Sequence, residues 1–131
     1  MATLDHINNF VPVTDTLGTS GQPTTEQFAE IKNAGYDIVI NLAMPSSENA
    51  ISNEGELVTR QDMKYVHIPV KWDHPKRSDF DCFAGILNAN PDTKTYAHCV
   101  VNMRVSAFTF LHRIIHQNID PSESLEEGGE H

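Results

Sequence analysis

The stretch from Thr95 to Phe108 constrains the fold of this chain more than any other segment, because it predicts a strand, a tight loop and a helix in direct succession. Aromatic and β-branched residues before Cys99 favour a strand. Apolar residues after it recur at helical spacing. These residues are Met103, Ala107, Phe110, Leu111 and Ile114. Cys99 is therefore expected at the point where a strand ends and a helix begins.

Such a junction favours negative charge. The unpaired N–H groups of a first helical turn, together with the helix dipole, stabilise an anion. A free cysteine with a pKa of about 8.5 is only about 3% ionised at pH 7, whereas helix N-termini and basic neighbours can lower that pKa to about 3.5–7.5. Arg104 follows Cys99 by five positions and offers a planar fork of donors that suits two oxygens of an oxyanion. The loop thus combines a candidate nucleophile with a candidate oxyanion clamp.

The pattern His98-Cys99-(four residues)-Arg104 resembles the phosphate loop of protein tyrosine and dual-specificity phosphatases, in which five residues separate Cys from Arg. The shorter gap resembles a bacterial phosphatase-like family, also found as a domain fused to β-lactamase-like hydrolases. The hallmarks of that family include Ser-Gly-Gln-Pro and a Val-Ile-Asn-Leu strand, which occur here at 20–23 and 39–42. The resemblance covers roughly residues 15–118.

The resemblance implies roles for the residues of this loop. Cys99 would be the nucleophile and Arg104 would hold phosphate oxygens. Ser106, seven positions after Cys99, would stabilise the departing thiolate. Asn102 stands where the family has glycine, and asparagine tolerates left-handed backbone angles better than other non-glycine residues. The remaining residues expected to line the bound substrate are His98, Val100, Val101 and Met103.

A second candidate segment is the loop after the Ile-Pro-Val stretch at 68–70. In the resembled phosphatases a mobile loop at this place carries an Asp that protonates the leaving oxygen, and Asp73 occupies the position here. A positioned proton donor typically contributes ~10²–10⁴ in rate. Trp72 could shield the site. Asp79 and Asp81 compete for the role of acid, although both fit better in the first turn of the next helix.

The rest of the chain alternates predicted strands and helices, which predicts an α/β fold with a mostly parallel central sheet flanked by helices. We expect strands at 17–21, 37–42 and 65–70, and helices that start near Thr24, Pro45 and Ser78. Residues 1–14 are weakly patterned. Residues 1–120 form the expected phosphatase-like domain, and 121–131 form an acidic tail whose composition is typical of disorder.

Composition limits the class of protein. With 131 residues and 39% hydrophobic content, the chain suffices for one core. It has no long apolar run and no signal-peptide pattern at its start, which favours the cytoplasm. The net charge of −9 argues against nucleic acid and anionic membranes as partners. We expect no cofactor, and the oligomeric state stays open.

The other cysteine and several histidines also have structural interpretations. We expect His98 to orient the loop through hydrogen bonds, and Cys82 to be a core or partly covered residue without a disulfide to Cys99. His112 and His116 have a spacing that can hold a metal. Arg113 stands where the zinc-protease motif needs Glu, so we expect surface or half-buried histidines and no metal site.

These features predict a phosphatase that hydrolyses phosphate monoesters through a phosphocysteine, acting on a phosphorylated protein or a small phosphate ester. A catalytically weak or inactive phosphate-binding module is the nearest alternative, because Val100 and Val101 resist unusual backbone angles. A rhodanese-like sulfurtransferase also uses one loop cysteine before a helix. A redox sensor would require Cys82 to lie near Cys99.

Overall fold

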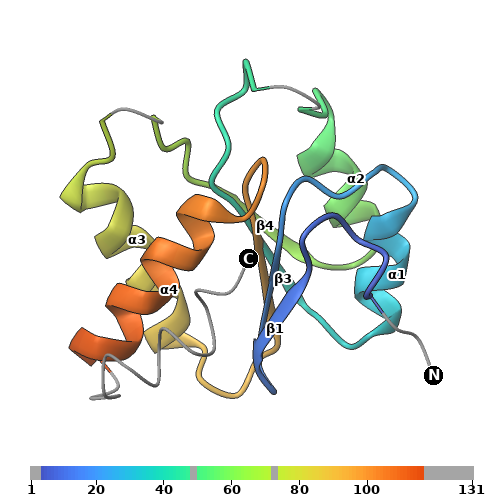
Figure 1. Ribbon diagram of the computed structural model, residues 1–131. Coiled ribbons are helices and arrows are strands. Elements are labelled where there is room, and N and C mark those ends of the chain that lie inside the picture. Colours follow the sequence, from blue (N-terminus) through green and yellow to red (C-terminus); the bar gives the residue numbers. More distant parts are fainter. Residues whose placement is uncertain (1–3, 48–49, 72–73, 117–131) are drawn as a thin grey trace.

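The computed structural model describes residues 4–47, 50–71 and 74–116. Within them a five-stranded sheet is flanked by four helices (Figure 1). The elements in chain order are β1 (Val11–Thr14), β2 (Leu17–Ser20), α1 (Gln27–Asn33), β3 (Ile38–Asn41), α2 (Glu54–Arg60), β4 (Lys64–His67), α3 (Arg77–Ala89), β5 (Thr95–His98) and α4 (Met103–His116). The predicted α/β class is confirmed.

The strand order is β1-β2-β5-β3-β4, and β2, β5, β3 and β4 run parallel. The central place of β5 puts its last residue, His98, in register with Ser20 of β2 and Asn41 of β3. Because the carboxyl ends of parallel strands meet at one edge of a sheet, the segment that follows β5 lies in the middle of that edge. This is the place where open α/β sheets bind ligands.

The first 14 residues contain a strand that the sequence analysis did not predict. Val11–Thr14 pairs antiparallel with β2, and the Thr14 hydroxyl accepts a hydrogen bond from the N–H of Thr16 at 3.2 Å in the turn. As an edge strand, β1 tolerates Pro12, which removes a donor that an inner strand would need. The alternation of half-buried residues in this strand is too short to distinguish a strand from a loop in the sequence.

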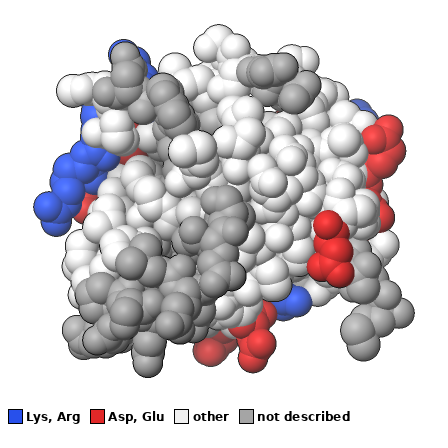
Figure 2. All heavy atoms as spheres, in the orientation of Figure 1, with Lys and Arg blue, Asp and Glu red and all other residues white. Residues whose placement is uncertain are grey.

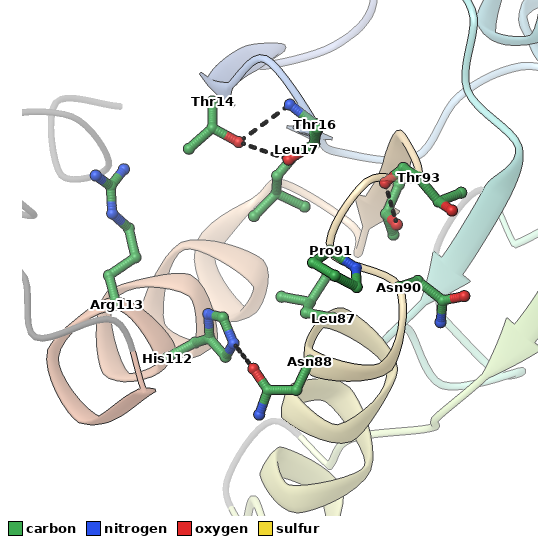
Figure 3. Close-up of a pocket in the computed structure, with 11 residues that line it drawn as sticks. Thr14, Thr16, Leu17, Leu87, Asn88, Asn90, Pro91, Thr93, His112 and Arg113 are labelled. Atoms are coloured by element: carbon green, nitrogen blue, oxygen red, sulfur yellow. Dashed lines mark hydrogen bonds between the residues drawn. The ribbon is translucent and has the colours of Figure 1, made fainter.

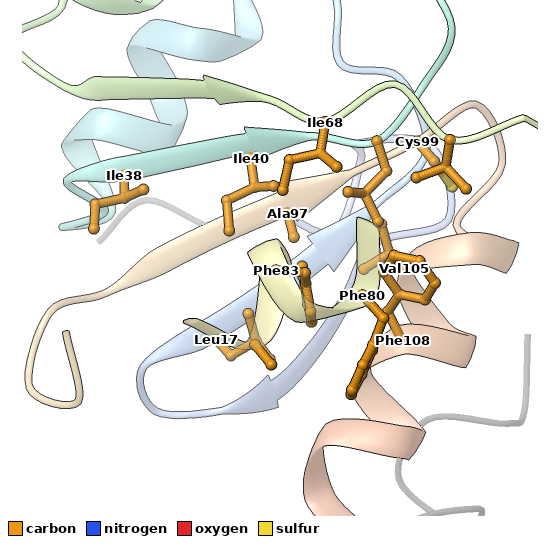
Figure 4. Close-up of a cluster of buried hydrophobic side chains, with 13 residues drawn as sticks. Leu17, Ile38, Ile40, Ile68, Phe80, Phe83, Ala97, Cys99, Val105 and Phe108 are labelled. Carbon is orange, nitrogen blue, oxygen red and sulfur yellow. The ribbon is translucent and has the colours of Figure 1, made fainter. Parts of the chain in front are cut away.

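Two hydrophobic clusters pack on opposite faces of the sheet. One lies under α3 and α4, and Figure 4 shows Phe80, Phe83 and Phe108 from these helices against Ile38 and Ile40 of β3. The other lies under α1 and α2. Its buried members are Leu4, Ile7, Phe28, Ile31, Tyr36, Val39, Val58, Met63 and Tyr96. The strands β3, β4 and β5 contribute to both clusters because successive side chains alternate between the two faces.

The helices begin later than expected at two places. The first starts at Gln27 rather than near Thr24, although the Gln27 side chain accepts the Thr24 N–H at 2.8 Å. The second starts at Glu54 rather than at Pro45. The third starts at Arg77, and its capping carboxylate is that of Asp79, which accepts the N–H of Lys76 at 3.1 Å. Ser78, one of the expected caps, is inside that helix.

Helix α4 forms as predicted, but its buried face differs from the apolar series that predicted it. Met103 and Leu111 of that series are 54% and 40% exposed, whereas Val105 and Phe108 are buried against the sheet. Apolar residues occur on both sides of this helix. The spacing of apolar residues therefore predicts a helix but does not predict which of its faces packs against the sheet. None of the described helices is long and apolar enough to span a bilayer.

Candidate active site

Cys99 follows β5 directly and is buried, with 1% of its surface exposed. Its N–H donates to the carbonyl oxygen of Ser20 at 3.3 Å, which ties the start of the loop to β2. The residue packs in the hydrophobic cluster that contains Val105 and Phe108 (Figure 4). The junction expected from the sequence is therefore present, with Cys99 between the strand and the helix.

The carbonyl groups of the loop are bound by the amino-terminal part of the chain. The Val100 oxygen accepts the N–H of Gln22 at 3.0 Å and the side-chain amide of Asn8 at 3.4 Å. The Val101 oxygen accepts the side-chain amide of Asn9 at 3.1 Å. These bonds fix the orientation of two consecutive peptide groups.

The N–H groups of the same loop are not used in this way. Within residues 4–47, 50–71 and 74–116, the N–H groups of Val100, Val101 and Asn102 donate to no protein acceptor. A backbone N–H group that is buried without an acceptor costs free energy of folding. Successive unpaired N–H groups before a helix N-terminus form a concave arrangement that stabilises an anion. The loop therefore offers three backbone donors next to Cys99.

Asn102 has the left-handed backbone expected of it, with φ of 71°. Its buried side chain donates to the Asn9 carbonyl at 2.9 Å and to the Thr19 hydroxyl at 3.1 Å. The Ser106 hydroxyl donates to the Asn102 side-chain oxygen at 3.3 Å. Asn102 thus replaces glycine without losing the turn, and it adds bonds that glycine could not make.

The Ser-Gly-Gln-Pro stretch at 20–23 packs directly against this loop. A Cβ atom on Gly21 would lie 2.5 Å from the Val100 oxygen and 2.7 Å from the Asn8 side-chain nitrogen. The Gly21 N–H also donates to the Asn8 oxygen at 2.7 Å. Gly21 is therefore required by the close approach of two backbone segments, and Gln22 provides the adjacent bond to the loop.

Glu54, the first residue of α2, was missed by the sequence analysis. It is 2% exposed, and its carboxylate lies 2.7 Å from His98 Nε2 and 2.8 Å from the donating Gln22 Nε2. Burial raises the pKa of Glu54, but hydrogen bonds from His98 and Gln22 and the charge of His98 outweigh it, so the pKa lies below its usual 4.5. An acidic residue in a first helical turn is ordinary, so the sequence carries no signal for this role.

Tyr65 extends the network to the neighbouring strands. Its phenol is hydrogen-bonded to Glu54 and accepts the side-chain amide of Asn41 at 3.0 Å. Burial, together with the nearby Glu54 charge, raises the pKa of Tyr65 to about 12. The network thus links side chains from the ends of β2, β3 and β5 to β4 and α2.

Three of the expected site residues cannot be placed as side chains. Arg104 is in the first turn of α4, and its side chain is not among those described. Trp72 and Asp73 lie outside the described residues. The competing acids have structural positions at the start of α3, where Asp79 caps the helix and Asp81 pairs with Arg77 at 3.3 Å. Val101 and Met103 are among the more exposed apolar residues, at 42% and 54%.

Two expectations about isolated residues were wrong. Cys82 is exposed rather than in the core, and both cysteines have free thiols. His112 is 2% exposed rather than on the surface, because it packs inward from α4 and bonds Asn88 of α3 at 2.9 Å. The His116 side chain is not described. Within the described residues, no group of three or more His, Cys, Asp and Glu could hold a metal ion.

A polar cavity of about 170 Å³ lies at the opposite, amino ends of β2 and β5 (Figure 3). Its lining residues are Thr14, Thr16, Leu17, Leu87, Asn88, Asn90, Pro91, Thr93, Thr95, His112 and Arg113. None of these is acidic, although the chain carries a net charge of −9. On the face drawn in Figure 2, charged side chains of both signs lie mostly at the rim, with the largest basic group at the left.

No protein-family model and no curated protein matches the sequence. Several solved protein structures do match this chain. A Shewanella putrefaciens CN-32 protein described as "Putative phosphatase (DUF442)" is 35% identical, with a TM-score of 0.85 over 97% of this chain and 82% of that one. P. aeruginosa TpbA is 18% identical, with a TM-score of 0.76 over 98% of this chain and 76% of its own.

Kinase associated phosphatase is 15% identical, with a TM-score of 0.77 over 97% of this chain and 83% of that one. At these low identities the similarity to TpbA and to kinase associated phosphatase concerns the fold. The similarity to the Shewanella protein is closer and covers most of both chains. The chain belongs to the DUF442 family, and its fold is that of the tyrosine and dual-specificity phosphatases.

Proposed function

We propose that this protein hydrolyses phosphate monoesters, in the manner of tyrosine and dual-specificity phosphatases, through a phosphocysteine at Cys99. The observation that carries the proposal is that the N–H groups of Val100, Val101 and Asn102 have no acceptor among the described residues. They lie between Cys99 and the N-terminus of α4, where a phosphoryl group would be surrounded by donors. The similarity to a DUF442 phosphatase agrees with this chemistry.

In the first step the Cys99 thiolate attacks phosphorus, an S–P bond forms, and the P–O bond to the leaving group breaks. The three loop N–H groups and the Arg104 guanidinium hold the equatorial oxygens. Asp73 gives its proton to the leaving oxygen, since an alkoxide or phenolate leaves poorly without one. The products of this step are the dephosphorylated alcohol or phenol and a phosphocysteine.

In the second step water attacks phosphorus, Asp73 takes a proton from the water, and the S–P bond breaks to release phosphate and the Cys99 thiolate. Ser106 would donate its hydroxyl proton toward the departing sulfur. In the structure that hydroxyl donates to Asn102 at 3.3 Å, a long bond that it can exchange for the sulfur when negative charge develops there. Asn102 thus keeps Ser106 close to the loop between turnovers.

The substrate class in this proposal is a phosphorylated protein or a small phosphate ester, without a cofactor. TpbA has been crystallised with phosphotyrosine, which supports a phosphorylated residue as ligand of this fold. His98, Val100, Val101, Met103 and Trp72 would surround the phosphate and the group that carries it. We further propose that residues 1–120 form the catalytic unit, that 121–131 form a tail, and that the protein works in the cytoplasm.

A phosphate-binding module with little turnover is the second candidate. It is favoured by the burial of Cys99, which leaves 1% of its surface exposed. A nucleophile must be reached by phosphorus, whereas loop N–H groups could bind phosphate without the thiol.

Hydrolysis of p-nitrophenyl phosphate by the native protein, by Cys99→Ser and by Cys82→Ser separates the two candidates. We expect Cys99→Ser to lose roughly 10³-fold or more in kcat, because a catalytic nucleophile has been removed. Cys82→Ser is the matched control, since Cys82 is exposed on α3, and it should retain the native rate.

Vanadate binding by the same proteins completes the experiment. Bound vanadate without turnover in the native protein would favour the binding module. A Cys99→Ser protein as active as the native one would exclude the phosphocysteine mechanism.

A further inference from the structure

The segment 4–10, which precedes β1, carries no functional pattern in the sequence, yet two of its residues reach the candidate active site. The side-chain amide of Asn8 donates to the Val100 oxygen at 3.4 Å, and that of Asn9 donates to the Val101 oxygen at 3.1 Å. Asn8 and Asn9 are exposed, so water could satisfy both amides. Burial therefore does not explain why each amide binds an oxygen 92 residues away along the chain.

Each of these bonds holds one end of a peptide group whose other end is a loop N–H group. A trans peptide group is planar, and its C=O and N–H point in opposite directions. The Val101 oxygen and the Asn102 N–H share one peptide group, and the Val100 oxygen and the Val101 N–H share the one before it. Those two N–H groups find no acceptor in the described ranges 4–47, 50–71 and 74–116. Fixing the two oxygen atoms therefore sets the direction in which the two N–H groups point.

Asn9 and Asn102 bind each other's backbone segments in both directions. Asn9 donates to the Val101 oxygen, and the Asn102 side-chain amide donates to the Asn9 oxygen at 2.9 Å. Both residues have left-handed backbone angles, with φ of 52° and 71°, which asparagine tolerates better than other non-glycine residues. Each asparagine thus supplies a backbone turn together with an amide donor, whereas glycine would supply the turn alone.

The residues on either side of Asn9 anchor it to the sheet. Ile7 is 1% exposed in the hydrophobic cluster under α1 and α2. The ring of Phe10 stacks on that of Tyr96 in β5, with 6.2 Å between the centroids and 8° between the planes. The Phe10 N–H also donates to the Ile7 oxygen at 3.1 Å. Asn9 therefore acts on the loop from a segment that the core holds in place.

We infer that Asn9 is a positioning residue of the candidate active site, which holds the peptide group between Val101 and Asn102 so that its N–H faces a bound phosphoryl oxygen. Asn8 has the lesser part, because the Val100 oxygen also accepts the Gln22 N–H at 3.0 Å. The effect on turnover rests on the proposed function. The effect on anion binding does not, since loop N–H groups can hold inorganic phosphate without any reaction.

Asn9→Gly removes the amide but keeps the backbone angle, because glycine adopts positive φ without steric cost. The affinity for vanadate and kcat/KM for p-nitrophenyl phosphate should both fall roughly 10–100-fold, because one oxyanion donor is misdirected. Asn8→Ala should lose less than about threefold, since Gln22 still holds the Val100 oxygen. Asp62→Gly is the matched control, because Asp62 is exposed after α2 with φ of 63°, and it should stay within about twofold of the native protein.

Nitrogen-15 NMR of backbone amides in the full chain, with inorganic phosphate as the probe, gives a readout that a general loss of stability would not change selectively. In the native protein the amide signals of Val100 and Asn102 should both shift as phosphate is added. In Asn9→Gly the response of Asn102 should fall and that of Val100 should persist. The oxygen in the peptide group of the Val100 N–H belongs to Cys99 and lies 3.3 Å from His98 Nδ1, away from the Asn9 bond.

Asn102→Gly and the double variant with Asn9→Gly test the reciprocal pair. If the two amides act as a unit, the double variant should bind vanadate about as tightly as the weaker-binding single variant. Losses that add in the double variant would overturn the pairing.

Native turnover and native vanadate affinity in Asn9→Gly would overturn the inference. So would a native protein whose Asn102 amide does not respond to phosphate, and this result needs no variant to fold. If the native protein bound phosphate with the expected amide shifts but failed to hydrolyse p-nitrophenyl phosphate, the proposed function would fail and the role of Asn9 would stand.

Discussion

Polar side chains gather at both ends of the sheet, and the two groups are bonded differently. At the carboxyl end, the buried Glu54 is bonded to the buried Gln22 and His98, next to a loop whose N–H groups have no acceptor among the described residues. At the amino end, the cavity of about 170 Å³ is lined mainly by Thr and Asn, and the buried His112 bonds Asn88 (Figure 3).

The difference shows what distinguishes a candidate active site from a polar cavity. Both ends bury a histidine that bonds a side-chain oxygen. At the carboxyl end the partner is a carboxylate, and the bonds converge on a loop whose N–H groups have no acceptor in the part of the chain that the structure describes. At the amino end the partner is a neutral amide on the neighbouring helix. The N–H groups without an acceptor beside a hydrogen-bonded network therefore favour the carboxyl end as the candidate site.

Among the substitutions that compare the two ends of the sheet, Glu54→Gln at the carboxyl end should lower the free energy of unfolding most. Replacing the buried carboxylate by a neutral amide weakens its hydrogen bonds from His98 and Gln22, and a hydrogen bond to a charged group contributes about 1.5–3 kcal/mol of unfolding free energy. The pKa of Glu54 is lowered in the folded state, so its contribution is present above about pH 4.5 and is lost as the pH falls through the lower folded value. Urea denaturation should show a gap between native and Glu54→Gln that shrinks below about pH 4.5.

Glu56→Gln serves as the control, since Glu56 is exposed, and it should stay within about 0.5 kcal/mol of the native protein. A gap for Glu54→Gln that is constant down to pH 3 would contradict the assignment of a buried, ionised carboxylate.

Gly21→Ala should have the next largest effect. The added Cβ would lie 2.5 Å from the Val100 oxygen, so the loop or β2 must shift, at a cost of about 1–3 kcal/mol. Turnover should fall with stability, because the displaced peptide belongs to the loop. Gly85→Ala is the matched control, since a Cβ there meets nothing within 4 Å on α3, and it should stabilise by about 0.5–1 kcal/mol. Equal effects of the two changes on turnover would count against the packing of Gly21 on the loop.

Asn88→Ala should have the smallest effect. It removes the 2.9 Å bond to His112 and should cost about 1 kcal/mol of unfolding free energy. Because this bond lies at the amino end of the sheet, kcat/KM for p-nitrophenyl phosphate should stay within about twofold of the native value. A larger loss of turnover in a folded variant would show that the two ends of the sheet are coupled. It would contradict the view that the amino-end cavity is separate from the candidate site.

Local patterns predicted much of the site. The junction at Cys99, the left-handed Asn102 and the α/β class all follow from short-range features of the sequence, and the structure confirms them. The packing role of Gly21 was not predicted, since its contact with the Val100 oxygen joins segments about 80 residues apart. The acid Asp73 and the clamp Arg104 stay predictions.

Features that depend on distant neighbours were missed or misread. Glu54 resembles any acidic residue in a first helical turn until the fold places it against His98, 44 residues away. Cys82 was expected to be a core or partly covered residue on or beside the apolar face of its helix, yet it is exposed. On α4 the apolar series that predicted the helix includes the exposed Met103 and Leu111, and the sequence analysis did not predict which face is buried.

The sequence by itself determined the order of strands and helices after β1, the place of Cys99 between β5 and α4, and the turn at Asn102, because these depend on backbone preferences within a few residues. Only the tertiary structure decided which face of α4 is buried, why Gly21 must be glycine, and that Glu54 pairs with His98. Those outcomes depend on close packing and on the bonding of buried polar groups between segments that are distant in the chain.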